Sequence, residues 1–403
     1  MIDLAAARRD PDALREALAR KGDAESLDRL LEADARWRDV TGRQEQARAE
    51  QKRLGRPSSP GEIERARQLK AELQGLEDEL AAAARERQHW WDRVPNPPDE
   101  TAPDGETEDD AEELRRVGEH PSFAFEPRDH LELARERGWI ETDQAANVVS
   151  GARFVYRLGD FALMELALYR FALDRIVKKG FVPVLPPVLV KAGPMYGTGF
   201  LPTDEVNIYE LERDQLYLTG TAEVALAGLH MGQTLDPDSL PRRYAGYSSC
   251  FRREAGAAGK DTRGMFRVHQ FDKVEMFSFV RPEDSPDEHE RLLAVEEELV
   301  QELGIPYRVV NVAAGDLGAS ATKKYDIEAW FPGQQRYREI TSTSNTTDYQ
   351  ARRLGVRLKG GGLVHTLNGT AVTARALIAI VENFQQEDGS VAVPDVLRQF
   401  GAP

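Results

Sequence analysis

The sequence predicts an α+β protein, in which a long helical hairpin precedes a domain built on an antiparallel sheet flanked by helices. Two observations lead to this prediction. Residues 26–94 hold two segments rich in helix-forming residues, separated by a proline-containing break at 57–61. Residues 247–280 hold two β-prone runs joined by a turn-forming stretch at 255–264, which is typical of a long antiparallel hairpin. We place the domain boundary after an acidic segment, which gives residues 1–115 and 116–403.

The composition is that of a globular protein. The 403 residues are 41% hydrophobic, and the net charge of −16 argues against indiscriminate binding of polyanions. The single cysteine, Cys250, cannot form a disulfide within the chain, and clustered Cys/His spacings are absent, so we expect no zinc site. The chain has no signal-peptide core and no apolar run of membrane-spanning length. We therefore expect no membrane segment and a cytoplasmic location.

The helical hairpin has the apolar spacing of an antiparallel coiled coil. Apolar residues recur in steps of three and four from Ala66 to Val94, and Arg87 is the one interruption of this row. Two helices of about 30 residues would extend roughly 45 Å. A purely structural or dimerising coiled coil is the plainer interpretation. Between Arg36 and Lys70, however, the sequence has ten Arg and Lys but only five Asp and Glu. A hairpin tip with this excess of positive charge suits an RNA backbone.

The segments that follow read as a linker and then as alternating helices and strands. Residues 95–113 contain four prolines and nine acidic residues, so we expect an extended or mobile linker. Residues 160–178 form an amphipathic helix, and residues 281–300 an acidic surface helix to which we assign no chemistry. We expect strands at 307–312 and 335–345. A glycine run at 360–362 leads toward a strongly apolar helix that ends near residue 385.

The predicted β-hairpin carries the chemistry. Because strand side chains alternate between faces, Arg252 and Glu254 share a face of the first strand, and Arg267, Phe271 and Glu275 share a face of the second. Guanidinium groups can bind carboxylate or phosphate through two parallel hydrogen bonds, and an exposed ring can stack on a nucleobase. The plainer alternative is a solvated face with cross-strand ion pairs.

Taken together, this spacing is more specific than any one residue. The string CFRREAGAAGKDTRGMFRVHQFDKVEMF at 250–277 resembles motif 2 of the class II aminoacyl-tRNA synthetases, in the form found in seryl-tRNA synthetases. The run from Gly180 to Leu189 resembles motif 1, which forms the subunit interface in that family. The segment QRYREITSTSN at 335–345 resembles a further family element, and NGTAVTAR, from Asn368 to Arg375, resembles motif 3. This last segment is one residue shorter than in many seryl enzymes, which leaves the contact made by Thr370 open.

The resemblance covers nearly the whole chain and implies a fold and a reaction. The fold would be a six-stranded antiparallel sheet flanked by helices, preceded by a coiled-coil arm that contacts tRNA. The enzyme would be a homodimer that joins L-serine and ATP into seryl-adenylate, with Mg²⁺ as cofactor. It would then transfer serine to the 3′ end of tRNA(Ser). Use of the selenocysteine tRNA, tRNA(Sec), is left open.

The resemblance also implies roles for particular residues. Arg252, Glu254 and Arg375 would be the catalytic residues. The ATP site would be formed by Arg252, Glu254, Arg267, Phe271, Glu339, Ser342 and Arg375. The serine site would be formed by Thr221, Glu223, Arg252, Glu275, Asn368 and Thr370. Glu339 and Ser342 would bind the metal, but their spacing gives them opposite parity in a strand, so a bulge or twist is needed to bring them to one face.

Three other interpretations share parts of this pattern. A ligase that charges a carrier protein would have a similar catalytic core, but it would lack the helical arm. A non-catalytic regulator would tolerate loss of Arg252, Glu254 or Arg375, and all three are present. A duplicate enzyme that serves antibiotic resistance or biosynthesis would share every motif, so the sequence does not exclude it.

Overall fold

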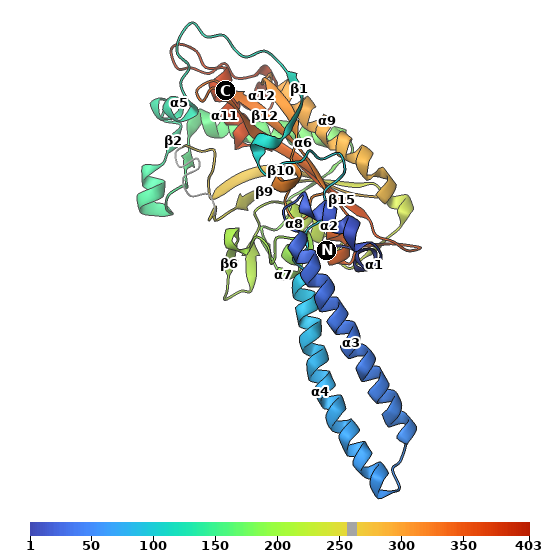
Figure 1. Cartoon of the computed structure of the whole chain (residues 1–403). Coiled ribbons are helices and arrows are strands. Elements are labelled where there is room, and N and C mark those ends of the chain that lie inside the picture. The colour runs from blue at the N-terminus through green and yellow to red at the C-terminus, as the bar shows by residue number, and fades with distance from the viewer. Residues whose placement is uncertain (256–263) are drawn as a thin grey trace. The chain divides into compact units, whose positions relative to one another are not determined.

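The computed structural model describes residues 1–255 and 264–403, and these form two compact units (Figure 1). The first unit is Met1–Pro97 and the second is Pro98–Pro403. The boundary expected near residue 115 therefore lies inside the second unit. Among the helices that the structure describes, none combines the length and the apolar character of a membrane span.

The first unit is the predicted helical hairpin on a short helical base. Its helices are α1 (Leu4–Arg9), α2 (Pro11–Ala19), α3 (Ala24–Leu54) and α4 (Pro60–Trp91). The long helices α3 and α4 run antiparallel (Figure 1) and pack through Val40 and Ala47 of α3 and through Leu69, Leu73 and Leu76 of α4, which belong to the predicted apolar row. The turn between them ends in a capping box, in which Ser59 and Glu62 satisfy the first backbone N–H groups of α4.

The interruption of the apolar row by Arg87 has a structural cause. Its guanidinium stacks on Trp37, 3.7 Å from the ring centroid, and lies 3.7 Å from the fully buried carboxylate of Asp34. Arg8 and Arg38 also bind Asp34, at 2.6 and 3.0 Å. Burial alone would raise the pKa of Asp34, but these three arginines hold it below its ordinary value. The arm thus has one buried charged cluster among its apolar layers.

The second unit is built on an antiparallel sheet. In the described part of the chain this sheet has eight strands, in the order β1-β11-β12-β13-β15-β10-β9-β4. The bounds are β1 (Glu112–Val117), β4 (Val182–Val184), β9 (Arg242–Phe251), β10 (Gln270–Val280), β11 (Tyr307–Asn311), β12 (Lys323–Phe331), β13 (Arg336–Thr347) and β15 (His365–Thr373). The prediction of six strands is wrong in number. The six central strands are antiparallel throughout, and β1 and β4 extend the sheet at its edges, with β4 parallel to β9.

The acidic segment at 95–113 leads into the edge strand β1. Residues 112–117 pair with β11, and the backbone N–H of Asp99 donates to Thr322 at 2.8 Å. The acidic side chains have a local use, because Asp110 accepts hydrogen bonds from the backbone N–H groups of Glu106 and Thr107. The segment that is rich in proline and acid thus contains hydrogen-bonded turns and the first two residues of an edge strand.

Helices cover both faces of the sheet. The back face packs against α6 (Gly159–Lys178), α9 (Ser285–Glu302) and α11 (Ala374–Asn383), which share one large apolar core with β10, β12 and β15. Helix α9 was expected to be a solvated surface helix, but it buries Leu292, Leu299 and Glu296. On the front face, α8 (Glu223–Gly228) and α10 (Tyr349–Leu354) pack on Phe277 and Phe279 of β10. The rest of the front face is left for a pocket.

Short elements complete the second unit. The remaining helices are α5 (His130–Glu136), α7 (Ala192–Thr198) and α12 (Asp395–Arg398). The remaining strands form three small sheets: β2 (Ile140–Glu141) with β3 (Tyr156–Arg157), β5 (Leu189–Val190) with β7 (Leu216–Leu218) and β6 (Tyr209–Leu211), and β8 (Thr234–Leu235) with β14 (Arg357–Leu358).

Candidate catalytic pocket

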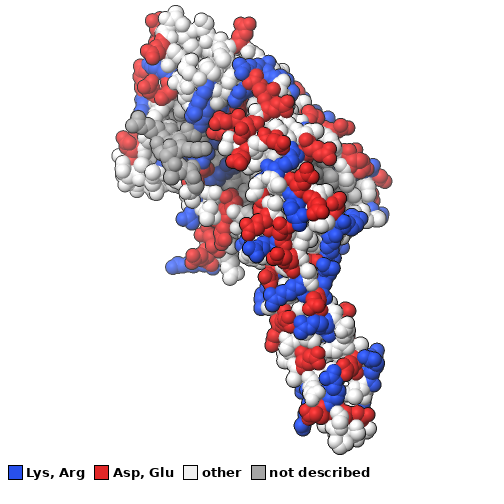
Figure 2. All heavy atoms as spheres, viewed as in Figure 1, with Lys and Arg blue, Asp and Glu red and all other residues white. Residues whose placement is uncertain are grey.

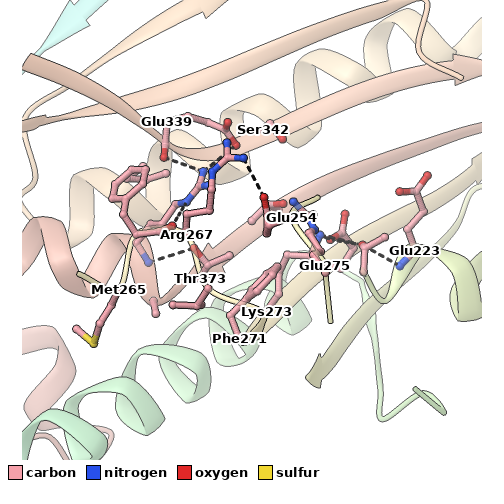
Figure 3. Close-up of a pocket in the computed structure, with 18 of the residues that line it drawn as sticks. Glu223, Glu254, Met265, Arg267, Phe271, Lys273, Glu275, Glu339, Ser342 and Thr373 are labelled. Carbon is pink, nitrogen blue, oxygen red and sulfur yellow. Dashed lines mark hydrogen bonds and ion pairs between the residues drawn. The ribbon is translucent and has the colours of Figure 1, made fainter. Parts of the chain in front are cut away.

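A pocket of about 340 Å³ lies on the front face of the sheet and brings all twelve residues of the predicted site together (Figure 3). They come from the β9–β10 hairpin, from β13 and β15, from the start of α8 with the residues just before it, and from the first turn of α11. The residues are Thr221, Glu223, Arg252, Glu254, Arg267, Phe271, Glu275, Glu339, Ser342, Asn368, Thr370 and Arg375. Residues that lie more than 150 positions apart in the sequence thus line one cavity.

The hairpin forms one wall of the pocket. Strands β9 and β10 are antiparallel, as predicted, with Phe271 opposite Cys250 and Glu275 opposite Gly246. The strands are shifted from the predicted runs, however, because β9 ends at Phe251 and β10 begins at Gln270. Most of the connection predicted at 255–264 lies outside the described residues.

This shift corrects the argument from strand alternation for three residues. Arg252, Glu254 and Arg267 lie beyond the strand ends, so strict alternation does not place them. Instead, Glu254 has a left-handed backbone (φ +50°), and its carboxylate accepts a hydrogen bond from Arg267 Nη1 at 2.8 Å. The Arg252 guanidinium lies 5.2 Å from the centroid of the Phe271 ring, and its Nε–H donates to the carbonyl of Gly220. The guanidinium, the ring and the carboxylate therefore do line the same pocket.

At one end the pocket holds two buried carboxyl groups. The Thr221 hydroxyl donates to Glu275 at 3.1 Å, and Lys273 Nζ donates to the same hydroxyl at 2.8 Å. Lys273 and Glu275 also form a buried ion pair. Glu223 accepts hydrogen bonds from Gln350 at 2.6 Å and from Asn368 at 3.0 Å.

The second of these carboxyls, Glu223, is tuned by its surroundings. Burial, followed by the charge of nearby Glu275, raises the pKa of Glu223 to about 7. A carboxyl group with this pKa gains or loses its proton near neutral pH. This end of the pocket can therefore bind a small polar molecule that carries an ammonium group and a hydroxyl.

Two β-bulges set the side chains of the neighbouring strands. In β13, Thr341 pairs with Ile327 and Glu339 with Glu328, so Ile340 is the extra residue of a bulge. The bulge that the parity of Glu339 and Ser342 requires is thus present, and both side chains line the pocket. In β15 a second irregularity places Thr370 opposite Glu275.

The other end of the pocket is cationic. Arg375, at the start of α11, lies 3.3 Å from the Glu339 carboxylate and 4.6 Å from the centroid of the Phe266 ring. Burial would raise the pKa of Glu339, but the charges of Arg375 and then Lys324 hold it below its ordinary value. An ionised carboxylate between cations is suited to a site that binds phosphate groups together with a metal ion.

Two lysines of the pocket were missed by the sequence argument. Lys273 lies between Phe271 and Glu275 on the same face of β10, so the alternation that selected its neighbours could have found it. Lys324 of β12 forms an ion pair with Asp326 at 2.9 Å. No signal in the sequence points to Lys324, because its strand joins the site only through the order of the sheet.

Comparisons with known proteins agree with this architecture. Residues 1–98 match the model of the seryl-tRNA synthetase N-terminal domain. Residues 207–384 match the class II tRNA synthetase core domain of the enzymes for G, H, P, S and T. A serine–tRNA ligase of Thermobifida fusca is 50% identical over 99% of this chain and 97% of its own length.

Solved structures agree as well. The seryl-tRNA synthetase of Pyrococcus horikoshii, complexed with ATP, superposes with a TM-score of 0.93 at 39% identity, covering 100% of this chain and 98% of that one. A cytoplasmic serine–tRNA ligase of Naegleria fowleri, in complex with AMP, gives a TM-score of 0.86 at 34% identity, covering 97% and 94%. With both family models matched along the chain, this protein belongs to the seryl-tRNA synthetase family.

Proposed function

We propose that this protein activates L-serine with ATP to form seryl-adenylate and pyrophosphate, and then transfers serine to the 3′ end of tRNA(Ser). The observation that carries the proposal is a single pocket with two different ends. Buried carboxyl and hydroxyl groups lie at one end, and arginines with an oxygen-rich strand lie at the other. Such a pocket suits a small hydroxylated amino acid beside the phosphates of a nucleotide.

The end of the pocket that holds Glu223 and Glu275 would bind serine. Thr221 and Glu223 would hold the substrate ammonium, while Glu275 and Thr370 would accept and orient the hydroxyl, with Asn368 beside them. Glu275 and Thr370 are cross-strand partners, which supports a shared ligand. A buried carboxylate that is built to accept a hydroxyl hydrogen bond rejects alanine, because that hydrogen bond is then missing.

The cationic end would bind ATP. Activation is an attack by the serine carboxylate on the α-phosphorus, and negative charge then builds on phosphate oxygens. Arg252 would bridge the carboxylate and the α-phosphate, and Arg375 and Arg267 would stabilise the terminal phosphates. Phe271 would stack on adenine and Glu254 would accept a hydrogen bond from its amino group.

We propose Mg²⁺ as the metal cofactor at this end. Glu339 and Ser342 offer two hard oxygen donors on one face of β13. In residues 1–255 and 264–403, no three His, Cys, Asp or Glu side chains are grouped as metal ligands. Two protein donors are enough for Mg²⁺, because it commonly takes its remaining ligands from phosphates and water. When bound, the ion would neutralise charge on the pyrophosphate that leaves.

The helical hairpin would bind tRNA. Figure 2 shows Lys and Arg side chains interspersed with acidic ones along it, and several of them form ion pairs across the two helices. Lys52, Arg53 and Arg56 are exposed around the turn. Such a surface suits the backbone of an RNA helix, which is recognised mainly by shape and phosphate contacts.

We further propose a homodimer through the motif 1 region. Helix α6 and the strand that follows it expose large apolar side chains, among them Leu166 at 60% and Leu185 at 81%. Leu163, Val177 and Val182 are exposed nearby in the sequence. A second copy of the chain would cover this surface by two-fold symmetry. The cytoplasmic location expected from the sequence stays a prediction.

Two assays test the proposed reaction. Serine-dependent exchange between ATP and pyrophosphate detects adenylate formation, and its absence would favour a non-catalytic regulator. Charging of purified tRNA(Ser) then separates a synthetase from a carrier-protein ligase. Deleting residues 26–94 should leave exchange intact and remove charging, whereas unaffected charging would refute the role of the arm. Charging of tRNA(Sec) in the same assay addresses the second acceptor.

A further inference from the structure

A carboxyl group lies fully buried behind the pocket, where the proposed reaction has no use for it. Glu296 of α9 faces the back of the sheet and is 0% exposed. The Thr341 hydroxyl of β13 donates to its Oε2 at 2.6 Å, whereas its Oε1 has no hydrogen-bond partner among the described residues. Burial raises the pKa of Glu296 well above its ordinary value.

The unpartnered oxygen lies against a glycine of the serine site. A Cβ built on Gly369 would be 2.7 Å from Glu296 Oε1 and 3.2 Å from the Thr343 hydroxyl. Gly369 stands in β15 between Asn368 and Thr370, whose side chains line the pocket on the opposite face of the sheet. The carboxyl of Glu296 therefore fills the space that any side chain at position 369 would need.

We propose that Glu296 is a positioning residue for the serine site: by its contact with Gly369 and its hydrogen bond to Thr341, it fixes the backbone that carries Asn368 and Thr370. The inference rests on the proposed function, since those two residues are assigned there to serine. An apolar side chain would fill the same volume without burying a polar group. It would leave the Thr341 hydroxyl without an acceptor. Strands β13 and β15 would then lose the side chain that contacts both of them.

The test is a double-mutant cycle between Glu296 and Gly369, read by pyrophosphate exchange. Glu296→Ala should raise the KM for serine about tenfold and the KM for ATP by a smaller factor, because Gly369 lies directly between two residues of the serine site, Asn368 and Thr370. Gly369→Ala should also raise the KM for serine, since the new Cβ collides with the carboxyl. The double variant should raise the KM for serine by less than the product of the two single increases, because the smaller residue at 296 makes room for the Cβ.

Two further variants separate positioning from general stability. Glu296→Gln keeps the shape and an acceptor for Thr341, so it should stay close to the wild type. Leu299→Ala removes another buried side chain of α9 and should lower the melting temperature without changing the KM for serine.

Each outcome has one meaning. A wild-type protein without serine-dependent exchange would refute the proposed function. An active wild type in which Glu296→Ala raises both KM values equally, or behaves like Leu299→Ala, would overturn the positioning role. Independent, multiplying effects of Glu296→Ala and Gly369→Ala would overturn it as well.

Discussion

The ammonium group of Lys273 forms a buried ion pair with the carboxylate of Glu275, at the end of the pocket that is proposed to bind serine. Glu223 and Glu275 are both buried there, and a second buried negative charge is unfavourable unless a cation is nearby. Lys273 supplies this cation from within the protein. Glu275 is thus paired with a cation before any substrate enters.

Replacing Lys273 by methionine should therefore damage the site severely. The change keeps the length of the side chain but leaves Glu275 without its cation, so serine-dependent exchange should fall by about 100-fold. The exchange rate as a function of serine concentration is the measurement. A KM for serine close to that of the wild type would show that Lys273 has no part in the site.

Arg252→Ala should abolish exchange. A positively charged group that contacts both the attacking carboxylate and the α-phosphate acts where charge develops, so we expect a loss of at least about 1,000-fold. Arg252→Lys should recover little, because lysine lacks the paired donors of a guanidinium. The neighbouring Arg253 does not line the pocket and gives a matched control in Arg253→Ala. Near-normal exchange in Arg252→Ala would refute its role.

Glu275→Ala should reduce discrimination between serine and alanine. When alanine binds, the wild-type carboxylate lacks the hydrogen bond that the serine hydroxyl donates, and this penalty disappears with the carboxylate. We expect the ratio of kcat/KM for serine to kcat/KM for alanine to fall about 100-fold, because serine loses a partner and alanine does not. An unchanged ratio would remove Glu275 from the pocket that recognises the side chain.

Serine binding should depend on pH through Glu223. A pKa raised to about 7 means that this carboxyl is protonated at lower pH and charged at higher pH. The substrate ammonium needs the charged form, so the KM for serine should fall as the pH rises from about 6 to about 8. The KM for ATP is the internal control. In Glu223→Gln the KM for serine should be higher and should vary less with pH, and a profile like that of the wild type would contradict this assignment.

Asp34→Ala should weaken the arm without touching the pocket. The substitution leaves three arginines without their shared buried partner, so we expect a loss of about 3 kcal/mol in the stability of the helical hairpin. Circular dichroism during thermal unfolding of the full chain measures this loss. Charging of tRNA should decline while exchange stays constant. Asp39→Ala, at an exposed ion pair in the same helix, should change neither the stability of the hairpin nor the charging of tRNA.

Local patterns in the sequence predict much of this fold and site. The heptad row gives the hairpin of α3 and α4, and β-prone runs around a turn give β9 and β10. The opposite parity of Glu339 and Ser342 correctly requires a bulge. These features depend on neighbours in the sequence, which is why periodicity can find them.

The features that were missed depend on distant parts of the chain. Strand β1 is a short edge strand, and only its pairing with β11 makes it part of the sheet. Lys324 enters the pocket through the order of the strands. Glu296 looks like one more acidic residue of a surface helix until the face that α9 buries is known. Side-chain alternation likewise fails at Arg267. Alternation holds only within a strand, and β10 begins at Gln270, after this residue.

The bulge at Ile340 has a consequence for how this strand can change in length during evolution. Ile340 is the one residue there without an opposite partner in β12. Its deletion would restore a regular ladder and leave Glu339 and Ser342 on one face, at the cost of a buried side chain. A deletion between Thr341 and Thr347 would instead move every side chain on one side of the deletion to the opposite face of the sheet. Natural insertions and deletions in this strand should therefore concentrate at a single position.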